Sequence, residues 1–222
     1  MDFISELTSK LSELKNIENA KSMQAYMKDN FVFLGIKTKE RRVILQNLWK
    51  KHQQEIKINF RAIAWELFNK KEREFHYCGV EIMIKEAKKK YTIEDIELIE
   101  KFIITHSWWD SVDFIAKYIL GNYLRQFPNE TYVVIERFSN ANNMWLNRST
   151  IIFQLDYKAT TNFELLISEC EKHKESNEFF IQKAIGWALR EYGTFNPKGV
   201  IHYVENTNLK SLSKKEALRK LI

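Results

Sequence analysis

Glycine and proline are scarce in this chain, with 6 glycines and 2 prolines among 222 residues. Average usage of the two together is about 12%. An all-β fold of this length would need many tight turns, and these are the residues that make them. The six glycines also form neither a GxG nor a GxxxxGK pattern, which excludes a glycine-rich phosphate loop. The chain is therefore expected to be almost wholly helical.

Apolar side chains recur at helical spacing along the whole chain. The expected helices cover about 3–14, 17–29, 38–51, 59–70, 72–90, 92–104, 107–127, 130–138, 141–157, 161–173, 176–191, 197–206 and 213–221. Thr38 is expected to cap its helix, and Thr92 with Asp95, like Ser107 with Asp110, has the spacing of a capping box. No segment has the composition of a linker, so we expect one domain over residues 1–222.

The spacing of the helices indicates a repeat. Four similar openings, FHYCG at Phe75, WDSVD at Trp109, WLNRS at Trp145 and FIQKA at Phe180, lie 34, 36 and 35 residues apart. A period of about 35–40 residues made of two helices is typical of an α-solenoid. The small residues of tetratricopeptide repeats are missing, which favours HEAT-like antiparallel helix pairs. We predict an all-α, curved solenoid with a basic concave face; a plain helical bundle with accidental spacing is the alternative.

Charge and composition exclude several classes of protein. The net charge is +6, with a pI near 9.1, a modest basic excess that hints at nucleic acid. Cys78, Cys170 and five scattered histidines have no metal-binding spacing, so neither a metal nor a cofactor is expected. The N-terminal MDFISEL lacks the basic region of a signal peptide, and no apolar run reaches the ~18 residues of a membrane span. We expect a cytoplasmic protein.

Asp113 is the acidic residue that most needs an explanation. It shares a helix face with Trp109, four residues earlier, and its neighbours in sequence are apolar. Asp110, three residues after Ser107, is explained by a capping interaction, whereas Asp113 lies past the first turn. A carboxylate in such surroundings needs a partner or a chemical role. A salt bridge with Arg148 of the next repeat and a catalytic function are both open.

A second pattern lies near the C-terminus. Lys183, Trp187 and Arg190 are spaced i, i+4 and i+7, so they form one stripe on a helix. A tryptophan between two cations suits a phosphate backbone with a base or sugar nearby. The alternative is a core tryptophan beside two long side chains that keep their charges in water. Arg148, three residues after Trp145, places a cation in the repeat between this stripe and Asp113.

Several separated motifs resemble one family over nearly the whole chain. They are AYMKDNFVFLGIKTKERR (25–42), SWWDSVD (107–113), WLNRSTIIFQL (145–155) and FFIQKAIGWALREYG (179–193). Together they resemble the AlkD type of the DNA alkylation repair family, which comprises HEAT-like DNA glycosylases. The resemblance implies excision of positively charged N3- and N7-alkylated purines, such as 3-methyladenine and 7-methylguanine, from duplex DNA. It also implies that the damaged base is not flipped into a pocket.

The resemblance also implies roles for individual residues. Trp109, Asp113 and Trp187 would form the catalytic cleft, and Arg148 would hold a phosphate near the lesion. The DNA surface would include Tyr26, Lys37, Phe179, Phe180 and Arg190, with Lys183 added from its stripe. Lys37 departs from the family, where this position is more often polar and uncharged. The expected partner is double-stranded DNA containing alkylated purines, bound by a monomer without an obligate protein partner.

The chemistry of the substrate agrees with one carboxylate and no cofactor. An N-alkylated purine already carries positive charge, so it leaves without the general acid that a glycoside hydrolase ordinarily needs. One aspartate then stabilises the oxocarbenium that develops on the sugar and orients water. The cleft motifs contain no lyase lysine, so a monofunctional enzyme is expected. The rival interpretations are a non-catalytic protein that binds damaged or branched DNA and a protein-interaction scaffold.

Overall fold

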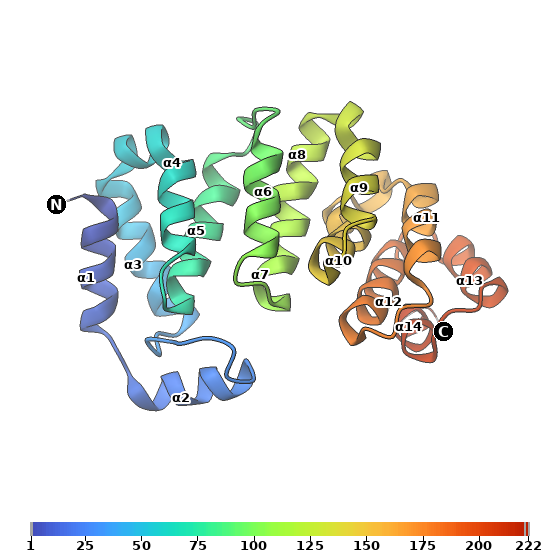
Figure 1. Cartoon of the computed structure of the whole chain (residues 1–222), viewed down its shortest axis with the longest axis horizontal. Helices are drawn as coiled ribbons and strands as arrows, with labels where there is room; N and C mark the ends of the chain where they lie inside the picture. Colours follow the sequence, from blue (N-terminus) through green and yellow to red (C-terminus); the bar gives the residue numbers. More distant parts are fainter. Residues whose placement is uncertain (1, 220, 222) are drawn as a thin grey trace. The chain divides into compact units, whose positions relative to one another are not determined.

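The computed structural model describes residues 2–219 and 221 and shows a helical chain (Figure 1). Within this range, extended pairing is confined to one isolated bridge between Val32 and Glu72. Successive antiparallel helix pairs confirm the predicted all-α solenoid. The chain is divided into two compact units, Met1–Lys90 and Tyr91–Ile222. The single domain over 1–222 and the basic concave face stay predictions.

The first unit contains helices α1 to α5. Their bounds are α1 Phe3–Glu13, α2 Ile17–Tyr26, α3 Thr38–Lys51, α4 Gln53–Phe68 and α5 Arg73–Glu86. Thr38 is the first residue of α3, and Lys37 takes the capping position without a side-chain cap bond, so the predicted Thr38 cap is wrong. Helix α4 begins six residues before the expected residue 59, because Ile56 is fully buried and extends the apolar face into a polar stretch.

The second unit continues the helix pairs. Its elements are α6 Asp95–Ile104, α7 Trp109–Phe114, the π-helix η1 Ile115–Leu120, α8 Gly121–Gln126, the 3₁₀ turn η2 Pro128–Glu130, α9 Thr131–Ser139, α10 Met144–Ile152, the 3₁₀ turns η3 Phe153–Asp156 and η4 Lys158–Thr160, α11 Phe163–His173, α12 Phe179–Gly193, α13 Pro197–Asn206 and α14 Ser211–Leu218. Residue 220, part of the expected helix 213–221, lies outside the described residues.

The repeat predicted from the sequence is present in the helices. Helices α5, α7, α10 and α12 begin at residues 73, 109, 144 and 179, at intervals of 36, 35 and 35 residues. Within the second unit, α10 packs between η1 and α12, and α12 packs against α14. Within the second unit, α7 with η1, α10 and α12 therefore lie side by side, and residues at equivalent positions of the repeat face one another.

Two expected helices are interrupted. The segment 107–127 is divided into α7, the π-helix η1 and α8, and the segment 141–157 stops being α-helical at Ile152. The capping box expected at Ser107 is wrong, since its hydroxyl donates to the carbonyl of Ile103 at 2.6 Å and α7 begins only at Trp109. Of the two hydrogen bonds of the capping box expected at Thr92, one is confirmed: the Asp95 carboxylate accepts from the Thr92 backbone N–H at 2.8 Å.

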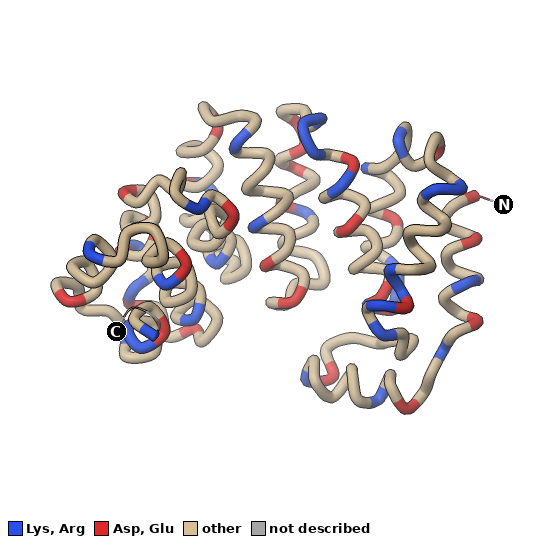
Figure 2. Tube along the Cα trace, turned by 180° about the vertical axis from the view of Figure 1, so that it is seen from behind, with Lys and Arg blue, Asp and Glu red and all other residues tan. Residues whose placement is uncertain are grey.

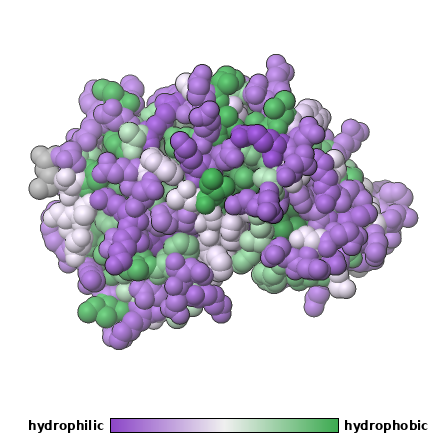
Figure 3. Space-filling view, in the orientation of Figure 1, coloured by the Kyte–Doolittle hydropathy of each residue, from purple (hydrophilic) through white to green (hydrophobic). Residues whose placement is uncertain are grey.

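Close packing joins α12 to α14. A Cβ atom added to Gly186 would lie 2.5 Å from the Glu216 Cβ and 2.8 Å from the Ser213 carbonyl oxygen, so only glycine allows this approach. Buried apolar side chains of α10, α11, α12, α13 and α14 form the surrounding core. Most of the face shown in Figure 3 is hydrophilic, with apolar side chains scattered over it.

In the first unit, a buried carboxylate holds the segment that leads into α3. Glu74 is fully buried and accepts hydrogen bonds from the backbone N–H groups of three consecutive residues, 34, 35 and 36, at 3.0, 2.8 and 3.1 Å. Gly35 has φ +90°, and an added Cβ would lie 2.0 Å from the Asn16 carbonyl oxygen. Glu74 thus fixes the segment that ends at Lys37 against the start of α2.

We expect Glu74→Gln to lower the free energy of unfolding of this unit by about 2–3 kcal/mol, because an amide cannot replace an anion that accepts three backbone hydrogen bonds. Urea unfolding followed by circular dichroism measures the change. The matched control is Glu72→Gln, two residues earlier and half-buried, which should stay within about 0.5 kcal/mol of the wild type. Equal effects of the two substitutions would contradict an anchoring role for Glu74.

Candidate active site

The site residues predicted in the second unit occupy one position of the repeat. Asp113, Arg148 and Lys183 are each the fifth residue of their helix, in α7, α10 and α12 respectively. Helix α10 contacts α7 on one side and α12 on the other. The repeat therefore places a carboxylate and two cations in one row. In the first unit, the fifth residue of α5 is Tyr77.

Asp113 and Arg148 form a bidentate ion pair. The Arg148 Nε and Nη2 atoms donate to the two carboxylate oxygens of Asp113, each at 2.8 Å. The Asp113 side chain is 14% exposed and that of Arg148 is 4% exposed. The third nitrogen, Nη1, donates to the Phe180 carbonyl oxygen. The salt bridge left open by the sequence therefore exists, and Arg148 joins three successive repeats.

Burial and charge act in opposite directions on Asp113. Removal from water raises the pKa of its carboxyl group above the ordinary value, and the nearby Asp110 adds to this; the hydrogen bonds and charge of Arg148 lower the pKa but do not cancel the effect of burial. Each carboxylate oxygen accepts one hydrogen bond from Arg148 and keeps a further lone pair. Arg148 thus fixes the direction of the Asp113 carboxylate, which still reaches solvent.

Aromatic side chains surround the arginine. The rings of Trp108, Trp145 and Phe180 form a cluster, with centroids 5.9 Å apart for the two tryptophans and 5.3 and 5.1 Å from Phe180. The Arg148 guanidinium lies 6.0 Å from the Phe180 ring centroid. Phe179, the first residue of α12, is 57% exposed and contacts Phe180 edge to face. Phe180 is therefore mainly a support for Arg148, while Phe179 faces solvent.

The other two predicted cations converge on a glutamate that sequence reasoning missed. Lys183 and Arg190 both form ion pairs with Glu216 of α14, whose side chain is only 10% exposed. Arg219 lies 4.0 Å from the same carboxylate. Figure 2 shows the resulting mixture of basic and acidic segments around α12 and α14. Three cations thus share the one carboxylate of Glu216, and this cluster of four side chains has a net positive charge.

The electrostatics of Lys183 reflect this crowding. The pKa of Lys183 lies below its ordinary value, and burial is the largest cause. The positive charges of Arg190, Arg219 and Arg148 lower the pKa further. Arg148 is thus close enough to influence Lys183, which links the two ion pairs. Glu216 left no signal in the sequence, since its partners lie about 30 residues away and the contact depends on the approach at Gly186.

The two tryptophans expected in the cleft are both half-buried. Trp109 is the first residue of α7, one turn before Asp113, and Trp187 lies one turn after Lys183 on α12. Trp187 also packs against the apolar core of the second unit. Trp108 was not singled out from the sequence, although its place beside Trp109 was visible there.

Two of the predicted DNA contacts belong to the first unit. Tyr26 is the last residue of α2 and is 68% exposed, and Lys37 is exposed immediately before α3. Both therefore have side chains that a ligand can reach.

Membrane spans and metal clusters are both missing from the described residues. None of the helices in this range combines the length and apolar character needed to cross a membrane. No group of three or more His, Cys, Asp and Glu side chains in the same range has an arrangement suited to a metal ion.

Comparison with known proteins identifies the family. The profile described as DNA alkylation repair enzyme matches residues 7–221. The chain belongs to this family. Three of the sequence motifs that resemble this family carry Asp113, Arg148 and the stripe of Lys183, Trp187 and Arg190 on α12.

Solved structures agree with the family. A predicted DNA alkylation repair enzyme from Enterococcus faecalis is 32% identical, with a TM-score of 0.85 over 93% of this chain and 96% of the other. The protein smu.31 from Streptococcus mutans UA159 is 14% identical, with a TM-score of 0.59 over 82% of this chain and 98% of the other, and shares the fold. No curated protein gives a significant match. The DNA alkylation repair family indicates a role in repair of alkylated DNA, with DNA as the partner.

Proposed function

We propose that this member of the family is a monofunctional DNA glycosylase that hydrolyses the N-glycosidic bond of N3- and N7-alkylated purines in duplex DNA. The observation that carries the proposal is the Asp113 carboxylate, which is fixed by two hydrogen bonds of 2.8 Å yet still reaches solvent. Membership of the family supports DNA as the substrate.

The proposed reaction uses the charge already present on the damaged base. The C–N bond breaks with departure of the neutral base, and positive charge moves onto the deoxyribose. Asp113 stabilises this oxocarbenium and orients the attacking water through its remaining lone pairs. The water oxygen forms the new bond to C1′ of the sugar, and the proton it loses passes to solvent. Trp109 and Trp187 contact the lesion nucleotide, where cation–π attraction contributes about 0.5–2 kcal/mol for each ring. Neither a cofactor nor a metal takes part in this mechanism.

We assign Arg148 to positioning Asp113 rather than to holding a phosphate alone. Its Nε and Nη2 atoms bind the carboxylate, its Nη1 binds the Phe180 carbonyl oxygen, and its side chain is 4% exposed. A guanidinium has five N–H donors in a planar fork, so a phosphate has access only to donors left at its edge. The DNA contacts of Tyr26, Lys37, Phe179, Phe180, Lys183 and Arg190 likewise stay proposals.

A non-catalytic protein that binds damaged or branched DNA is the second candidate. The same ion pair favours it, because a carboxylate bound at both oxygens by an arginine has a structural role even without chemistry. Release of a free base distinguishes the two candidates, whereas DNA binding alone does not.

The first test is release of 7-methylguanine from methylated duplex DNA, without added metal. We expect release by the wild type and a loss of about 100-fold or more in Asp113→Asn, because the amide cannot stabilise the oxocarbenium. Asp110→Asn, three residues away on the same helix, is the matched control and should keep its activity. Single-turnover rates are compared after urea unfolding has shown that each variant is folded.

The outcomes of this test are distinct. A folded wild type that binds DNA but releases no base would favour the non-catalytic candidate. Equal loss in both aspartate variants would contradict the assignment of Asp113, and an unfolded Asp113→Asn would indicate that the ion pair is mainly structural.

The acidic limb of the pH profile is a second test. Excision requires ionised Asp113, and burial raises the pKa of that group. Activity should therefore be fully present above the raised pKa and be lost as the pH falls through it, at a pH above the ~3.9 of an unperturbed aspartate. Base release is measured between about pH 4 and 8 and corrected for spontaneous loss. A limb that persists unchanged in the residual activity of Asp113→Asn would assign it to another group.

The salt dependence of DNA binding tests the cations on α12. Glu216→Gln removes the negative charge shared by Lys183 and Arg190, which leaves both available to phosphates. Binding to undamaged duplex should tighten, and the slope of log K against log salt should steepen by about 0.9 for each additional phosphate neutralised. Glu205→Gln, exposed on α13, is the control for a simple change in net charge. Equal slopes in the two variants would remove Lys183 and Arg190 from the DNA contacts.

A further inference from the structure

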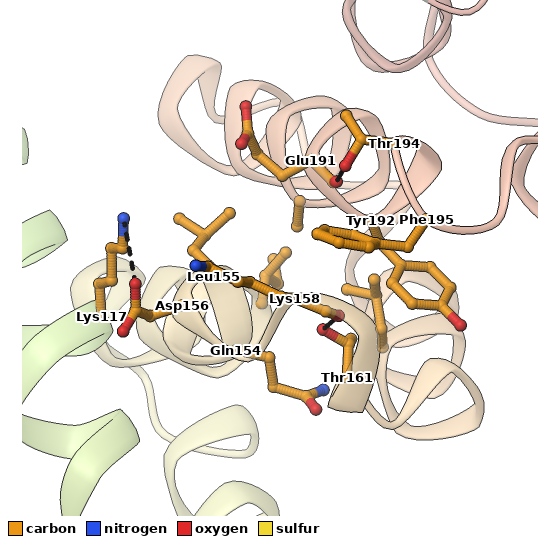
Figure 4. Close-up of a pocket in the computed structure, with 13 residues that line it drawn as sticks. Lys117, Gln154, Leu155, Asp156, Lys158, Thr161, Glu191, Tyr192, Thr194 and Phe195 are labelled. Atoms are coloured by element: carbon orange, nitrogen blue, oxygen red, sulfur yellow. Dashed lines mark hydrogen bonds and ion pairs between the residues drawn. The ribbon is translucent and has the colours of Figure 1, made fainter.

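A pocket opens beside the candidate active site, where α10 gives way to 3₁₀ turns. Its volume is about 240 Å³, and it lies between η1, the turns η3 and η4, and the C-terminal half of α12 (Figure 4). The chain leaves the α-helical path after Ile152, and the 3₁₀ turn that follows contributes Gln154, Leu155 and Asp156 to the pocket.

The pocket belongs to the same helices as the proposed catalytic residues. Lys117 lies in the turn that follows Asp113, and Glu191 lies one turn after Trp187. One α-helical turn advances about 5.4 Å along the axis. A group held in this pocket is therefore within about one or two turns of the residues proposed to contact the lesion.

The walls of the pocket are apolar and partly aromatic. They comprise Ile151, Leu155, Leu166, Ala188, Tyr192 and Phe195. At about 240 Å³ the pocket is smaller than the roughly 300–1,000 Å³ typical of sites for drug-sized ligands. It has the size and the lining for one flat heterocycle.

The charged groups at the pocket keep hydrogen-bonding capacity. Asp156 lies 3.9 Å from the Lys117 nitrogen and 3.8 Å from an Arg125 nitrogen, beyond direct hydrogen bonds. Glu191 lies 3.9 Å from the Arg190 Nε. Among the described residues, Lys158 has no ion-pair partner within 4 Å.

Three of the neutral polar side chains of the pocket are already engaged. Gln154 exchanges two hydrogen bonds with the backbone of Asn162, at 2.8 and 3.1 Å. The hydroxyl groups of Thr161 and Thr194 donate to the carbonyl oxygens of Lys158 and Glu191, each at 2.8 Å. A ligand therefore meets two carboxylates and two ammonium groups around an apolar floor.

We propose that this pocket binds a purine base of the guanine type. Such a base presents N–H donors side by side at N1 and N2, which suit the two oxygens of the Glu191 carboxylate. Its O6 acceptor, which 7-methylguanine also has, suits a lysine ammonium group, as it does in the major groove of DNA. Its faces are flat and pack on Tyr192 and Phe195. A wholly apolar ligand would contact only the walls, whereas a base also uses the charged groups at the rim, among which Asp156 is 40% and Glu191 46% exposed.

Two sources supply the same chemistry. One is the base released by the proposed excision, and this source rests on the proposed function. The other is an unstacked guanine of the bound DNA. The damaged base itself is not placed here, since the proposed reaction takes place at Asp113.

The first experiment measures binding of free 7-methylguanine and of guanine by equilibrium dialysis. The wild type should bind both with a Kd of about 1 mM or tighter, as suits so small a ligand, and adenine and cytosine should bind more weakly. Glu191→Gln should weaken binding about tenfold or more, because a bidentate acceptor is lost. Glu205→Gln, exposed on α13, should bind like the wild type.

A second variant tests the location. Ala188 lines the pocket and is 5% exposed, so Ala188→Leu should fill the space and abolish binding. Circular dichroism and urea unfolding establish that this variant is folded. Should it fail to fold, Lys158→Met, at an exposed turn position, takes its place and should weaken binding of guanine. Absence of saturable binding by the wild type, or equal binding by Glu191→Gln and Glu205→Gln, would overturn the proposal.

The sources are separated with DNA. A duplex carrying a bulged guanine is compared with one carrying an abasic bulge, using wild type and Glu191→Gln. An affinity gain that needs both the guanine and Glu191 assigns the pocket to an unstacked nucleotide; dependence on Glu191 for the free base alone assigns it to the product. Asp113→Asn should bind the free base normally, so a wild type that releases no base but still binds guanine would refute the proposed function and leave the pocket proposal intact.

Discussion

The bidentate bond between Arg148 and Asp113 is the interaction on which the rest of the site depends. It places both partners at fixed positions, with two hydrogen bonds of 2.8 Å between α10 and α7. The bond from Arg148 to the Phe180 carbonyl oxygen adds α12. Three repeats that are about 35 residues apart in sequence are thereby joined at one guanidinium. A displacement of any one of the helices would change the direction of the carboxylate, which is the group proposed to act.

The repeat explains why the charges meet. Equivalent positions on neighbouring helices of a solenoid face one another, and the fifth residues of α7, α10 and α12 are Asp113, Arg148 and Lys183. Lys183 in turn meets Glu216 on α14. The sign of the charge therefore changes along the row from Asp113 to Glu216, with the two cations in the middle. Burial lowers the pKa of Lys183, and the positive charges of Arg190, Arg219 and Arg148 lower it further.

The sequence predicted the fold and left the Asp113–Arg148 salt bridge as one of two open interpretations of Asp113, and the reasons are local. Helical periodicity and the 34- to 36-residue spacing follow from which side chains face the core, so both were visible without coordinates. The pair Asp113–Arg148 was visible because an unexplained carboxylate and a cation recurred one period apart. The capping role given to Ser107 was wrong, because a hydroxyl can also bond back to the carbonyl four residues earlier.

Other features depend on tertiary packing and left no pattern. The helix break after Ile152 occurs within a stretch whose apolar periodicity continues, so the pocket beside α12 was not predictable. Glu216 reaches Lys183 and Arg190 only because Gly186 lets α14 approach α12. Such contacts are decided by how closely two helices pack, and a sequence read one helix at a time does not contain that distance.

The energetics of the central pair bear on its purpose. Replacement of a buried ion pair by apolar side chains of similar volume is often neutral or stabilising, by up to about 4 kcal/mol. Buried apolar side chains flank both residues in α7 and α10, so the ion pair is one of several contacts between these helices. Burial raises the pKa of Asp113, so a carboxylate that stays ionised and fixed at this position has a desolvation cost. Under the proposed function, that cost serves to place a negative charge beside the positive charge that appears only when the glycosidic bond breaks.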